Sequence, residues 1–411
     1  MWGRYLNDKT HCVTAMLPRR TILLGAAALA GTARAQRVLD LALPGGPFER
    51  PTSSAFPQKG EMIVQRMRPP LLETPMEVFD QGVFTPNDRF FVRWHHADIP
   101  TSIDAAAFRL KVHGAVAKPL SLSLDTLLKL PQIEYAAVNQ CSGNSRGLFE
   151  PRIAGAQWRH GAMGNARWTG VRLKDVLDLA GVKGDGVAVR FGGLDGPLMP
   201  DSPDYLKSLA LDHARDGEVM IAYLQNGEPL PLLNGFPLRL VVPGWFSTYW
   251  VKMLSDIEVL TRPDENYWMA KAYRVPDMPF GSVQPGATGF PTKPISTMPP
   301  RSWITSHADG ARLTAGGPLA VRGIALGGDT GVAKVELSVD GGRSWQDARL
   351  GTDEGKYSFR RFEAELPPQT GQVALMSRCT NSAGVAQPLE PNWNHSGYLR
   401  NVAETVRLVA A

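Results

Sequence analysis

Apolar and polar positions alternate in short runs along most of the chain, and these runs predict both strands and short helices. Phe108–Val112, for example, alternates with the period of two that a half-buried strand requires. Four segments predict strands, namely residues 108–112, 133–138, 187–191 and 219–223. Two segments predict short helices, namely residues 124–130 and 173–180. Because both kinds of run occur between residues 90 and 280, the pattern favours a mixed α+β domain.

The pattern changes on either side of this domain. Residues 36–87 are rich in proline and hold few periodic runs, so we predict an irregular segment that wraps over the domain that follows. Residues 280–300 are rich in Pro, Gly and Ser, which is typical of a linker. Beyond it, runs at 319–325, 332–339 and 373–378 predict strands only, and Asp340-Gly341-Gly342 predicts a tight turn. We therefore expect an immunoglobulin-like β-sandwich over residues 286–411, after a first domain over residues 36–285.

The head of the chain has the pattern of an export signal. Arg19 and Arg20 precede a short apolar run, Ile22–Ala30, and a small-residue cleavage pattern ends at Ala35. Paired arginines with these features are typical of twin-arginine export, so we expect residues 1–35 to be removed and the protein to be periplasmic. The apolar run is too short to span a membrane, and we predict no spanning segment elsewhere. Because this route carries folded proteins, it favours a cofactor loaded in the cytoplasm.

Composition limits the classes of function. The 411 residues are 43% hydrophobic and 20% charged, which is ordinary for a soluble globular protein. The formal net charge is +5, but residues 1–35 contribute +4 of it and leave +1 for the rest. This balance argues against nucleic-acid binding. Met16 is an alternative start, in which case residues 1–15 do not belong to the protein.

The chain has three cysteines, Cys12, Cys141 and Cys379. Cys12 leaves with the export signal, and the other two could pair in an oxidising compartment. There is no Cys-x-x-Cys-His for covalent c-type haem, and the cysteines are too few for an iron–sulfur cluster. Cys141 follows a predicted strand and begins a Gly-containing turn, Cys141–Gly147. A thiolate there could ligate a soft metal or act as a nucleophile, and the alternative is a buried, inert cysteine.

Three other segments carry candidate chemistry. In Phe90–His96, Arg93 and His95 point to the same side of an extended chain, which suits a small oxyanion, although an arginine on a strand is often only a surface ion pair. Leu233–Lys252 gathers Asn, Arg, Ser and Lys around Gly and Pro turns and could bind a phosphate and a polar heterocycle, or form a plain hairpin. It lacks the spacing of a Rossmann or P-loop cradle. Asn266–Arg274 packs aromatics with cations, as a core segment also would.

Together these segments resemble the sulfite oxidase family of molybdenum enzymes, and most closely the bacterial periplasmic sulfite dehydrogenases. The family's motifs come in order over nearly all of the mature chain: Phe-Phe-Val-Arg-x-His, Cys-Ser-Gly-Asn-x-Arg, Gly-Leu-Asp, Asn-Gly-x-Pro-Leu-Pro, Gly-Phe-Pro-x-Arg-x-Val-Val-Pro-Gly and Val-Lys-x-Leu. In the second domain, Val-Asp-Gly-Gly-x-Ser-Trp and Trp-Asn-x-x-Gly-Tyr match the family's dimerisation domain. The resemblance implies one molybdenum–molybdopterin per chain, with the Cys141 thiolate as the protein ligand of the metal.

The resemblance also implies roles for further residues. It assigns the pterin and its phosphate to Phe91, Arg93, His95, Cys141, Asp195, Asn234, Arg239, Ser247 and Lys252. It assigns the catalytic pocket to Arg93, His95, Arg146 and Tyr273. The sequence departs from the family at two places. Asn234 stands where the vertebrate enzymes have a histidine. The substrate-pocket arginine that animal enzymes take from the second domain has no clear counterpart, and Arg343 and Arg378 are the candidates. The haem domain of the animal enzymes is absent.

The implied function is oxygen-atom transfer that converts sulfite to sulfate, with a c-type cytochrome accepting the electrons. The resemblance further implies a homodimer, or a heterodimer with a cytochrome subunit. One alternative keeps the cofactor and changes the substrate to sulfane sulfur on a carrier protein, to nitrate or to methionine sulfoxide. Another is a non-catalytic periplasmic binding or adhesion protein in which the β-sandwich is the working part.

Overall fold

The computed structural model describes residues 37–45, 48–314 and 316–411. The predicted export signal and Cys12 lie outside these ranges. Within them, no helix is long and apolar enough to cross a membrane.

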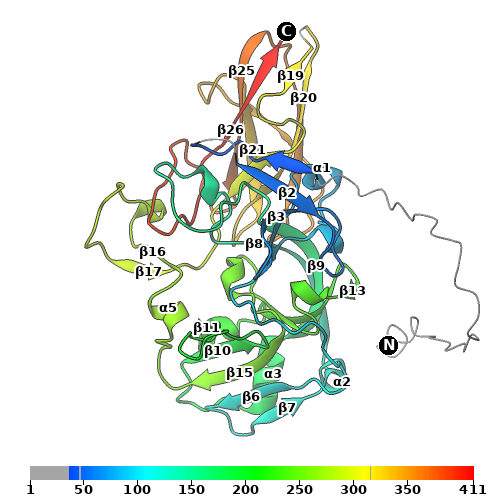
Figure 1. The fold of residues 1–411 in the computed structure, drawn as a ribbon, viewed down its shortest axis with the longest axis vertical. Coiled ribbons are helices and arrows are strands. Elements are labelled where there is room, and N and C mark those ends of the chain that lie inside the picture. The colour runs from blue at the N-terminus through cyan, green and yellow to red at the C-terminus, as the bar shows by residue number, and fades with distance from the viewer. Residues whose placement is uncertain (1–36, 46–47, 315) are drawn as a thin grey trace, which may run out of the picture. The chain divides into compact units, whose positions relative to one another are not determined.

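A five-stranded antiparallel sheet opens the described chain (Figure 1), in the order β1-β2-β3-β4-β5. Its strands are β1 Val38–Asp40, β2 Glu49–Ser53, β3 Met62–Arg66, β4 Leu71–Glu73 and β5 Val92–Arg93. Helix α1, Val78–Gln81, and the 3-10 turn η2, Asn87–Arg89, lie between β4 and β5. The prediction of an irregular segment over residues 36–87 was therefore wrong. Strands of three to five residues are too short to show a period, and their pairing comes from neighbouring strands.

Two further sheets carry most of the first domain. One has the order β13-β12-β9-β8, with β14 also paired to β12, and the other has the order β11-β10-β15-β6-β7. The strands of the first are β8 Gln132–Gln140, β9 Met163–Arg172, β12 Met220–Gln225, β13 Glu228–Pro229 and β14 Arg239–Val241. Those of the second are β6 Leu110–Gly114, β7 Leu120–Leu122, β10 Ala188–Gly193, β11 Leu206–Ala210 and β15 Leu254–Leu260.

Short helices connect these strands. They are α2 Leu124–Leu127, α3 Leu173–Ala180, α4 Leu211–Ala214 and α5 Tyr267–Ala270. The 3-10 turns are η3 Arg146–Leu148, η4 Leu232–Asn234, η5 Ser247–Tyr249 and η6 Pro279–Gly281. The predicted helix over residues 173–180 is confirmed as α3. The helix predicted over residues 124–130 is shorter in the structure, as α2. It begins after Ser123, whose side-chain oxygen accepts a hydrogen bond from the Thr126 N–H.

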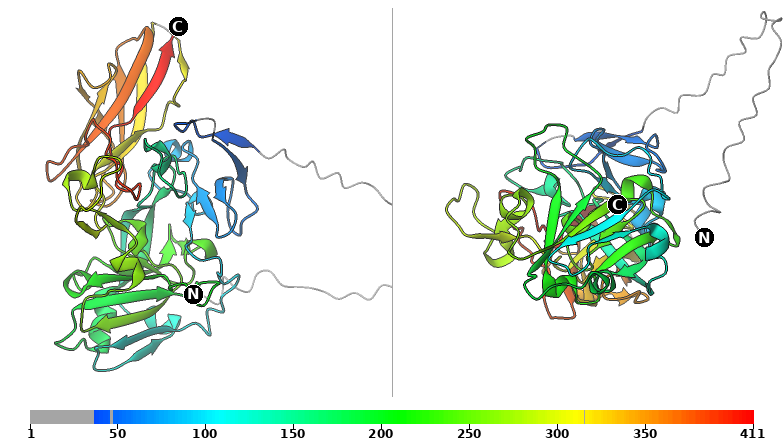
Figure 2. Two further views of the ribbon diagram at one scale, coloured as in Figure 1. Left: turned by 60° about the vertical axis from the view of Figure 1, so that its left-hand side comes forward. Right: turned by 90° about the horizontal axis from the view of Figure 1, so that it is seen from below.

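The second domain is a sandwich of two sheets (Figure 2), as predicted. A short ladder of β16 Arg274–Pro276 with β17 Thr292–Pro294 precedes it. One sheet has the order β18-β20-β24-β23, and its strands are β18 Arg301–Ile304, β20 Leu319–Leu326, β23 Arg349–Leu350 and β24 Arg360–Leu366. The other has the order β19-β26-β25-β21-β22, and its strands are β19 Arg312–Leu313, β21 Val332–Ser338, β22 Gln346–Asp347, β25 Gly371–Asn381 and β26 Thr405–Ala410. Side chains such as Val321, Val335 and Leu375 fill the space between the sheets.

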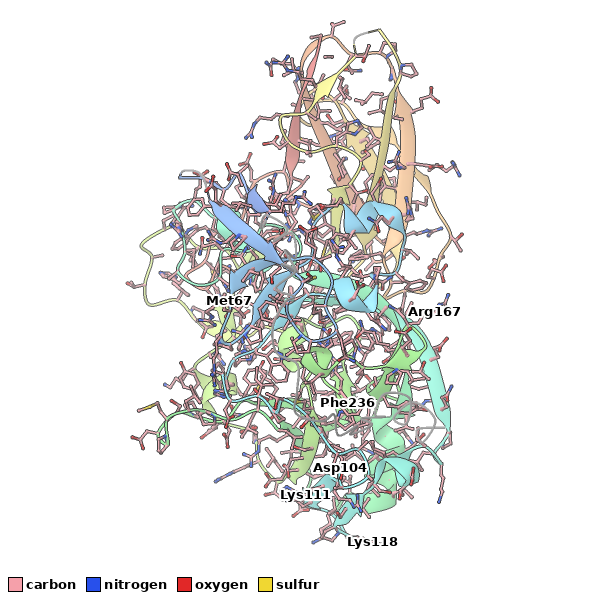
Figure 3. The ribbon with its side chains drawn as sticks, turned by 45° about the vertical axis from the view of Figure 1, so that its right-hand side comes forward. Met67, Asp104, Lys111, Lys118, Arg167 and Phe236 are labelled. Atoms are coloured by element: carbon pink, nitrogen blue, oxygen red, sulfur yellow. The ribbon has the colours of Figure 1, made fainter. Side chains whose placement is uncertain are left out.

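The two domains share a hydrophobic core. Val138 on β8 and Trp303 on β18 belong to one buried cluster, and the Val138 N–H donates to the Tyr357 carbonyl oxygen at 2.8 Å. At the opposite end of the first domain, Lys111 and Lys118 lie away from the sandwich (Figure 3). The strand that leads to Cys141 is therefore packed directly against the second domain.

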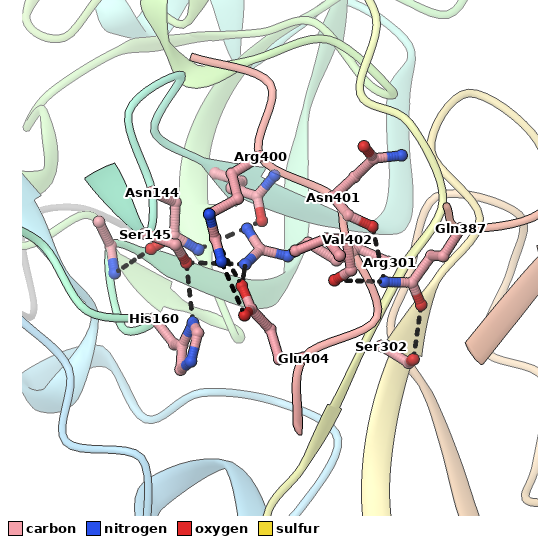
Figure 4. Close-up of polar contacts among 12 residues, drawn as sticks. Asn144, Ser145, His160, Arg301, Ser302, Gln387, Arg400, Asn401, Val402 and Glu404 are labelled. Atoms are coloured by element: carbon pink, nitrogen blue, oxygen red, sulfur yellow. Dashed lines mark hydrogen bonds and ion pairs between the residues drawn. The ribbon is translucent and has the colours of Figure 1, made fainter. Parts of the chain in front are cut away.

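A partly buried ion-pair network of the second domain lies at the same junction (Figure 4). Glu404 accepts from Arg400 at 2.7 and 3.0 Å and from Arg301 at 3.4 Å. Burial alone would raise the pKa of Glu404, but Arg400, with His160 and Arg301, lowers it to about 2. An unfolded glutamate has a pKa near 4.3, so the native state gains stability from ionised Glu404.

That gain predicts the pH dependence of stability. The stabilisation by ionised Glu404 is fully present above about pH 4.3 and is lost as the pH falls toward 2, because the pKa of Glu404 is lower in the folded state than in the unfolded state. Glu404→Gln should lower the free energy of unfolding at pH 7 by about 3 kcal/mol, and the gap to wild type should close toward pH 2. Denaturant titrations of both proteins over this range measure the gap. A gap that does not change with pH would contradict the assignment.

Candidate active site

Cys141 stands at the end of the longest antiparallel pairing of the first domain. The ladder of β8 with β9 runs from Gln132↔Val171 to Gln140↔Met163, so the next residue leaves the sheet. The Cys141 N–H still donates to the Ala162 carbonyl oxygen at 2.9 Å. Gly143 lets the turn close, because a Cβ there would lie 2.4 Å from the Arg146 guanidinium. The thiol is free, buried and held by the sheet at a defined position.

Most of the residues assigned from the sequence meet around one cavity, here called the inner cavity. Those lining it are Phe91, Arg93, His95, Cys141, Asn234, Arg239, Ser247, Lys252 and Tyr273. They come from β5 and its flanking residues, the turn after β8, turns η4 and η5, strand β14 and the segments just before β15 and β16, so segments far apart in sequence converge here. Arg93 and His95 both reach the cavity, which agrees with the same-side placement predicted from their spacing.

Positive charge accumulates at the inner cavity. Lys59 is buried and donates to the carbonyl oxygens of Asn87 and Phe90 at 2.8 and 2.9 Å, and also to Asn234 Oδ1. Arg239 donates to the Asn234 carbonyl oxygen at 3.0 Å. Burial lowers the pKa of Lys59 and of Lys252 to about 7, and that of Arg239 to about 9. None of these three cations forms an ion pair with a carboxylate within the described residues.

The cavity also carries donors without acceptors. Arg93 Nη1, Ser142 Oγ and Arg239 Nε at its lining, and Asn139 Nδ2 next to Arg239, are buried and lack a hydrogen-bond partner within the described part of the chain. Orphaned buried donors and unpaired cations are unfavourable unless an acceptor of opposite charge is bound. An anionic group rich in hydrogen-bond acceptors, with a soft metal within reach of the Cys141 thiolate, therefore fits this donor set.

His95 and Tyr273 form a short contact at the edge of the cavity. Their Nε2 and Oη atoms are 2.5 Å apart, and the imidazole stacks on Tyr205 with ring centres 3.5 Å apart. Burial, reinforced by the charges of Arg93 and Lys252, lowers the pKa of His95 well below its ordinary value, while burial raises the pKa of Tyr273. Both groups are neutral, so the tautomer of His95 decides the direction: Oη donates to a bare Nε2, and a protonated Nε2 donates to Oη. Tyr273 holds this position in a left-handed conformation, with φ of +55°.

A second cavity, here called the outer cavity, adjoins the inner one at Arg93, Cys141 and Tyr273, which line both. Its other cations are Arg50, Arg66, Arg146, Arg152 and Lys271. The lining holds no Asp or Glu, and none of these cations forms an ion pair with a carboxylate of the described chain. The space is thus suited to an anion that approaches Cys141 from outside.

Arg146 is held in the outer cavity by the second domain. Its Nε donates to the Ser396 carbonyl oxygen at 3.2 Å, and its guanidinium lies 5.2 Å from the ring centre of Tyr398. Tyr398 in turn stacks on Tyr273, with ring centres 5.6 Å apart. Sequence reasoning gave Tyr398 and Ser396 no role, although the Trp-Asn-x-x-Gly-Tyr motif contains both.

Three assigned residues lie elsewhere. Asp195 does not line the inner cavity, although its charge acts on Lys252 from nearby. The suggestion that Arg343 or Arg378 completes the pocket was wrong. Arg343 donates to the Asp340 carbonyl oxygen, and Arg378 donates to Glu336 at 3.0 Å across the β21–β25 pairing. Arg343 is therefore occupied within the turn after β21, and Arg378 within its own sheet.

Comparison with known proteins identifies the family. A model described as the oxidoreductase molybdopterin binding domain matches residues 96–268, and one described as the Mo-co oxidoreductase dimerisation domain matches residues 292–409. Sulfite oxidase from Gallus gallus is 32% identical over 362 residues, which cover 84% of this chain and 77% of that protein. The chain belongs to the sulfite oxidase family of molybdopterin enzymes.

Two further relatives extend the comparison for this sulfite oxidase family member. Mitochondrial sulfite oxidase from Mus musculus is 35% identical over 364 residues, and the match spans 84% of this chain but only 65% of the mouse protein. The crystal structure of the sulfane dehydrogenase SoxCD from Paracoccus pantotrophus has a TM-score of 0.71 and 27% identity, covering 82% of this chain and 83% of that one.

Proposed function

We propose that this protein is a molybdenum-dependent dehydrogenase that oxidises sulfite to sulfate. One observation carries the proposal: Cys141 lies between an inner cavity of unpaired cations and an outer cavity lined by cations and no carboxylate. The inner cavity suits an anionic cofactor, and the outer one suits an anionic substrate. When bound, the molybdenum–molybdopterin cofactor supplies two-electron oxygen-atom transfer.

The inner cavity would hold the cofactor through residues of this chain only. Cys141 would bind the metal, because a thiolate is the soft ligand that the site offers. Arg239, Lys252 and Ser247 would bind the phosphate, and Asn234, fixed by Lys59, would hydrogen-bond the pterin. Binding an anion would restore the ordinary charged state of the two lysines, because a nearby negative charge raises their pKa.

The outer cavity would bind the substrate. Sulfite carries one or two negative charges near neutral pH, and Arg93 and Arg146 would offset them while orienting the anion toward Cys141. Tyr273 would donate its one hydroxyl proton to the reacting oxygens, and His95 would leave that proton free by donating its own Nε2 proton to Oη.

Steering by the rim of the outer cavity should depend on salt. In a double variant, Arg66→Gln with Arg152→Gln, we expect KM for sulfite to rise about fivefold at low ionic strength, because the outer cavity loses two attracting charges. The difference should shrink as salt is added. The matched control, Lys111→Gln with Lys118→Gln, removes the same charge outside the cavity and should leave KM unchanged. Equal effects in both double variants would contradict steering by the rim.

We further propose that the protein works in the periplasm and passes electrons to a c-type cytochrome. Support comes from the paired arginines and apolar run within residues 1–35, and from the absence of a haem-binding Cys-x-x-Cys-His motif in the sequence. Reduction of cytochrome c by fractionated periplasm, lost on deletion of the gene, is the test of this part.

A second candidate function is oxidation of sulfane sulfur. It is favoured by the structural likeness to the sulfane dehydrogenase SoxCD. Initial rates at equal molybdenum content separate the candidates: oxidation of sulfite and of a protein-bound sulfane with an electron acceptor, and reduction of nitrate and methionine sulfoxide with a supplied electron donor. We expect sulfite to give the highest kcat/KM, and a higher value for the sulfane substrate would replace the first proposal with the second.

A further inference from the structure

The turn that carries Cys141 contains a strained residue. Ser145 is fully buried and has φ of +68°, the left-handed region that residues other than glycine rarely adopt. Such a conformation costs on the order of 1 kcal/mol and persists only where the surroundings hold it. Ser145 directly precedes Arg146 and comes four residues after Cys141.

Two side chains hold the Ser145 hydroxyl (Figure 4). Arg301 donates to Ser145 Oγ at 2.8 Å, and His160 Nδ1 lies 2.8 Å from the same oxygen. A guanidinium can only donate, so Oγ accepts from Arg301, and the hydroxyl proton is available to His160 when Nδ1 is unprotonated. The imidazole can accept this proton because burial keeps it neutral, with a pKa well below the ordinary value. The hydroxyl therefore has two hydrogen-bond partners, of which Arg301 is a donor.

Arg301 brings a rigid anchor from the second domain. It is the first residue of β18, is 1% exposed and lies 4.8 Å from the ring centre of Trp303. Its charge is offset by Glu404, which Arg400 holds with two hydrogen bonds. Arg301 lines neither the inner nor the outer cavity, so it does not touch a bound ligand of either.

The position of Ser145 governs that of Arg146. The Arg146 N–H donates to the Gly143 carbonyl oxygen at 3.0 Å. The Arg146 side chain packs closely against three glycines. A Cβ added at Gly143, Gly155 or Gly397 would lie 2.4, 3.0 or 2.8 Å from the Arg146 side chain. A small shift of Ser145 would therefore move Arg146 against these walls and change the shape of the outer cavity.

We propose that Arg301 and Ser145 form a positioning pair through which the second domain fixes Arg146 for anion binding. The inference rests on the proposed function, because it takes sulfite as the anion that Arg146 binds. Arg301 acts on the substrate only through Ser145 and Arg146. The pair makes the β-sandwich part of the substrate site rather than an appendage to it.

Ser145→Gly is the first test. Glycine adopts φ of +68° without strain, so it removes the hydroxyl and keeps the backbone conformation. We expect KM for sulfite, and the calorimetric Kd of the product sulfate, to rise about tenfold, while kcat changes far less, because a hydrogen bond from a charged group is lost at the anchor. If the Ser145 hydroxyl had no positioning role, Ser145→Gly would leave KM for sulfite and the Kd of sulfate unchanged.

Arg301→Lys, with Arg378→Lys as its matched control, completes the experiment. Both arginines belong to the second domain, pair with a glutamate and lie near a tryptophan ring, but only Arg301 reaches the Cys141 turn. We expect both variants to lower the melting temperature and only Arg301→Lys to raise KM and the sulfate Kd. Unchanged constants in both Ser145→Gly and Arg301→Lys would overturn the positioning pair. Wild-type protein that binds molybdenum but does not turn over sulfite would instead overturn the proposed function.

Discussion

Cys141→Ser should abolish sulfite turnover while the protein stays folded. Serine is close in size to cysteine and keeps the backbone contact to Ala162, so the sheet and the turn survive. A serine hydroxyl is not a soft ligand and stays protonated near neutral pH, so the metal loses its protein ligand. We expect kcat to fall by more than about 100-fold, measured as sulfite-dependent cytochrome c reduction per chain.

Cys379→Ser is the matched control for this variant. Cys379 is the other free, buried cysteine of the described chain, and it packs in the core of the β-sandwich. Its substitution should cost on the order of 1–3 kcal/mol of stability, because a hydroxyl replaces an apolar side chain, and should leave turnover per molybdenum unchanged. Near wild-type turnover in Cys141→Ser would remove Cys141 from the metal site.

Arg93→Gln should have the second largest effect. Arg93 lines both cavities, and one of its terminal nitrogens is buried without a partner, so its charge faces both the cofactor and the substrate. We expect kcat/KM for sulfite to fall on the order of 100- to 1,000-fold, because a charged donor aimed at the reacting anion is lost. Steady-state kinetics at constant molybdenum content measures the effect.

Arg93→Lys separates charge from geometry. Lysine keeps the charge but lacks the planar fork, so an intermediate loss is expected if Arg93 orients the anion. Arg152→Gln, at the rim of the same cavity, should cost only a few-fold, because its side chain is exposed and screened by salt. A loss in Arg93→Gln no larger than in Arg152→Gln would contradict the central place given to Arg93.

The local sequence pattern predicted those parts of the site whose positions depend on neighbouring residues in the chain. The strand before Cys141 and helix α3 showed clear periods, and both occur where expected. The extended run around Arg93 and His95 placed both side chains on one side, and both line the inner cavity. These outcomes depend on neighbours along the chain, which the sequence displays directly.

Contacts between distant segments could not be predicted in this way. Lys59 lies in a segment without a readable period, and its partner Asn234 is 175 residues away. Tyr398 and Ser396 reach the outer cavity only because the second domain packs on the Cys141 turn. The sequence alone does not show a partner for Arg378. Its ion pair with Glu336 follows from the register of β21 with β25. Pairing and domain packing decided each of these positions.

The most direct test of the account is molybdenum content and sulfite-dependent cytochrome c reduction, measured together on the same purified, natively exported protein. We predict one molybdenum per chain and reduction of cytochrome c that requires sulfite. A folded protein that contains no molybdenum and reduces no cytochrome c with sulfite would contradict it.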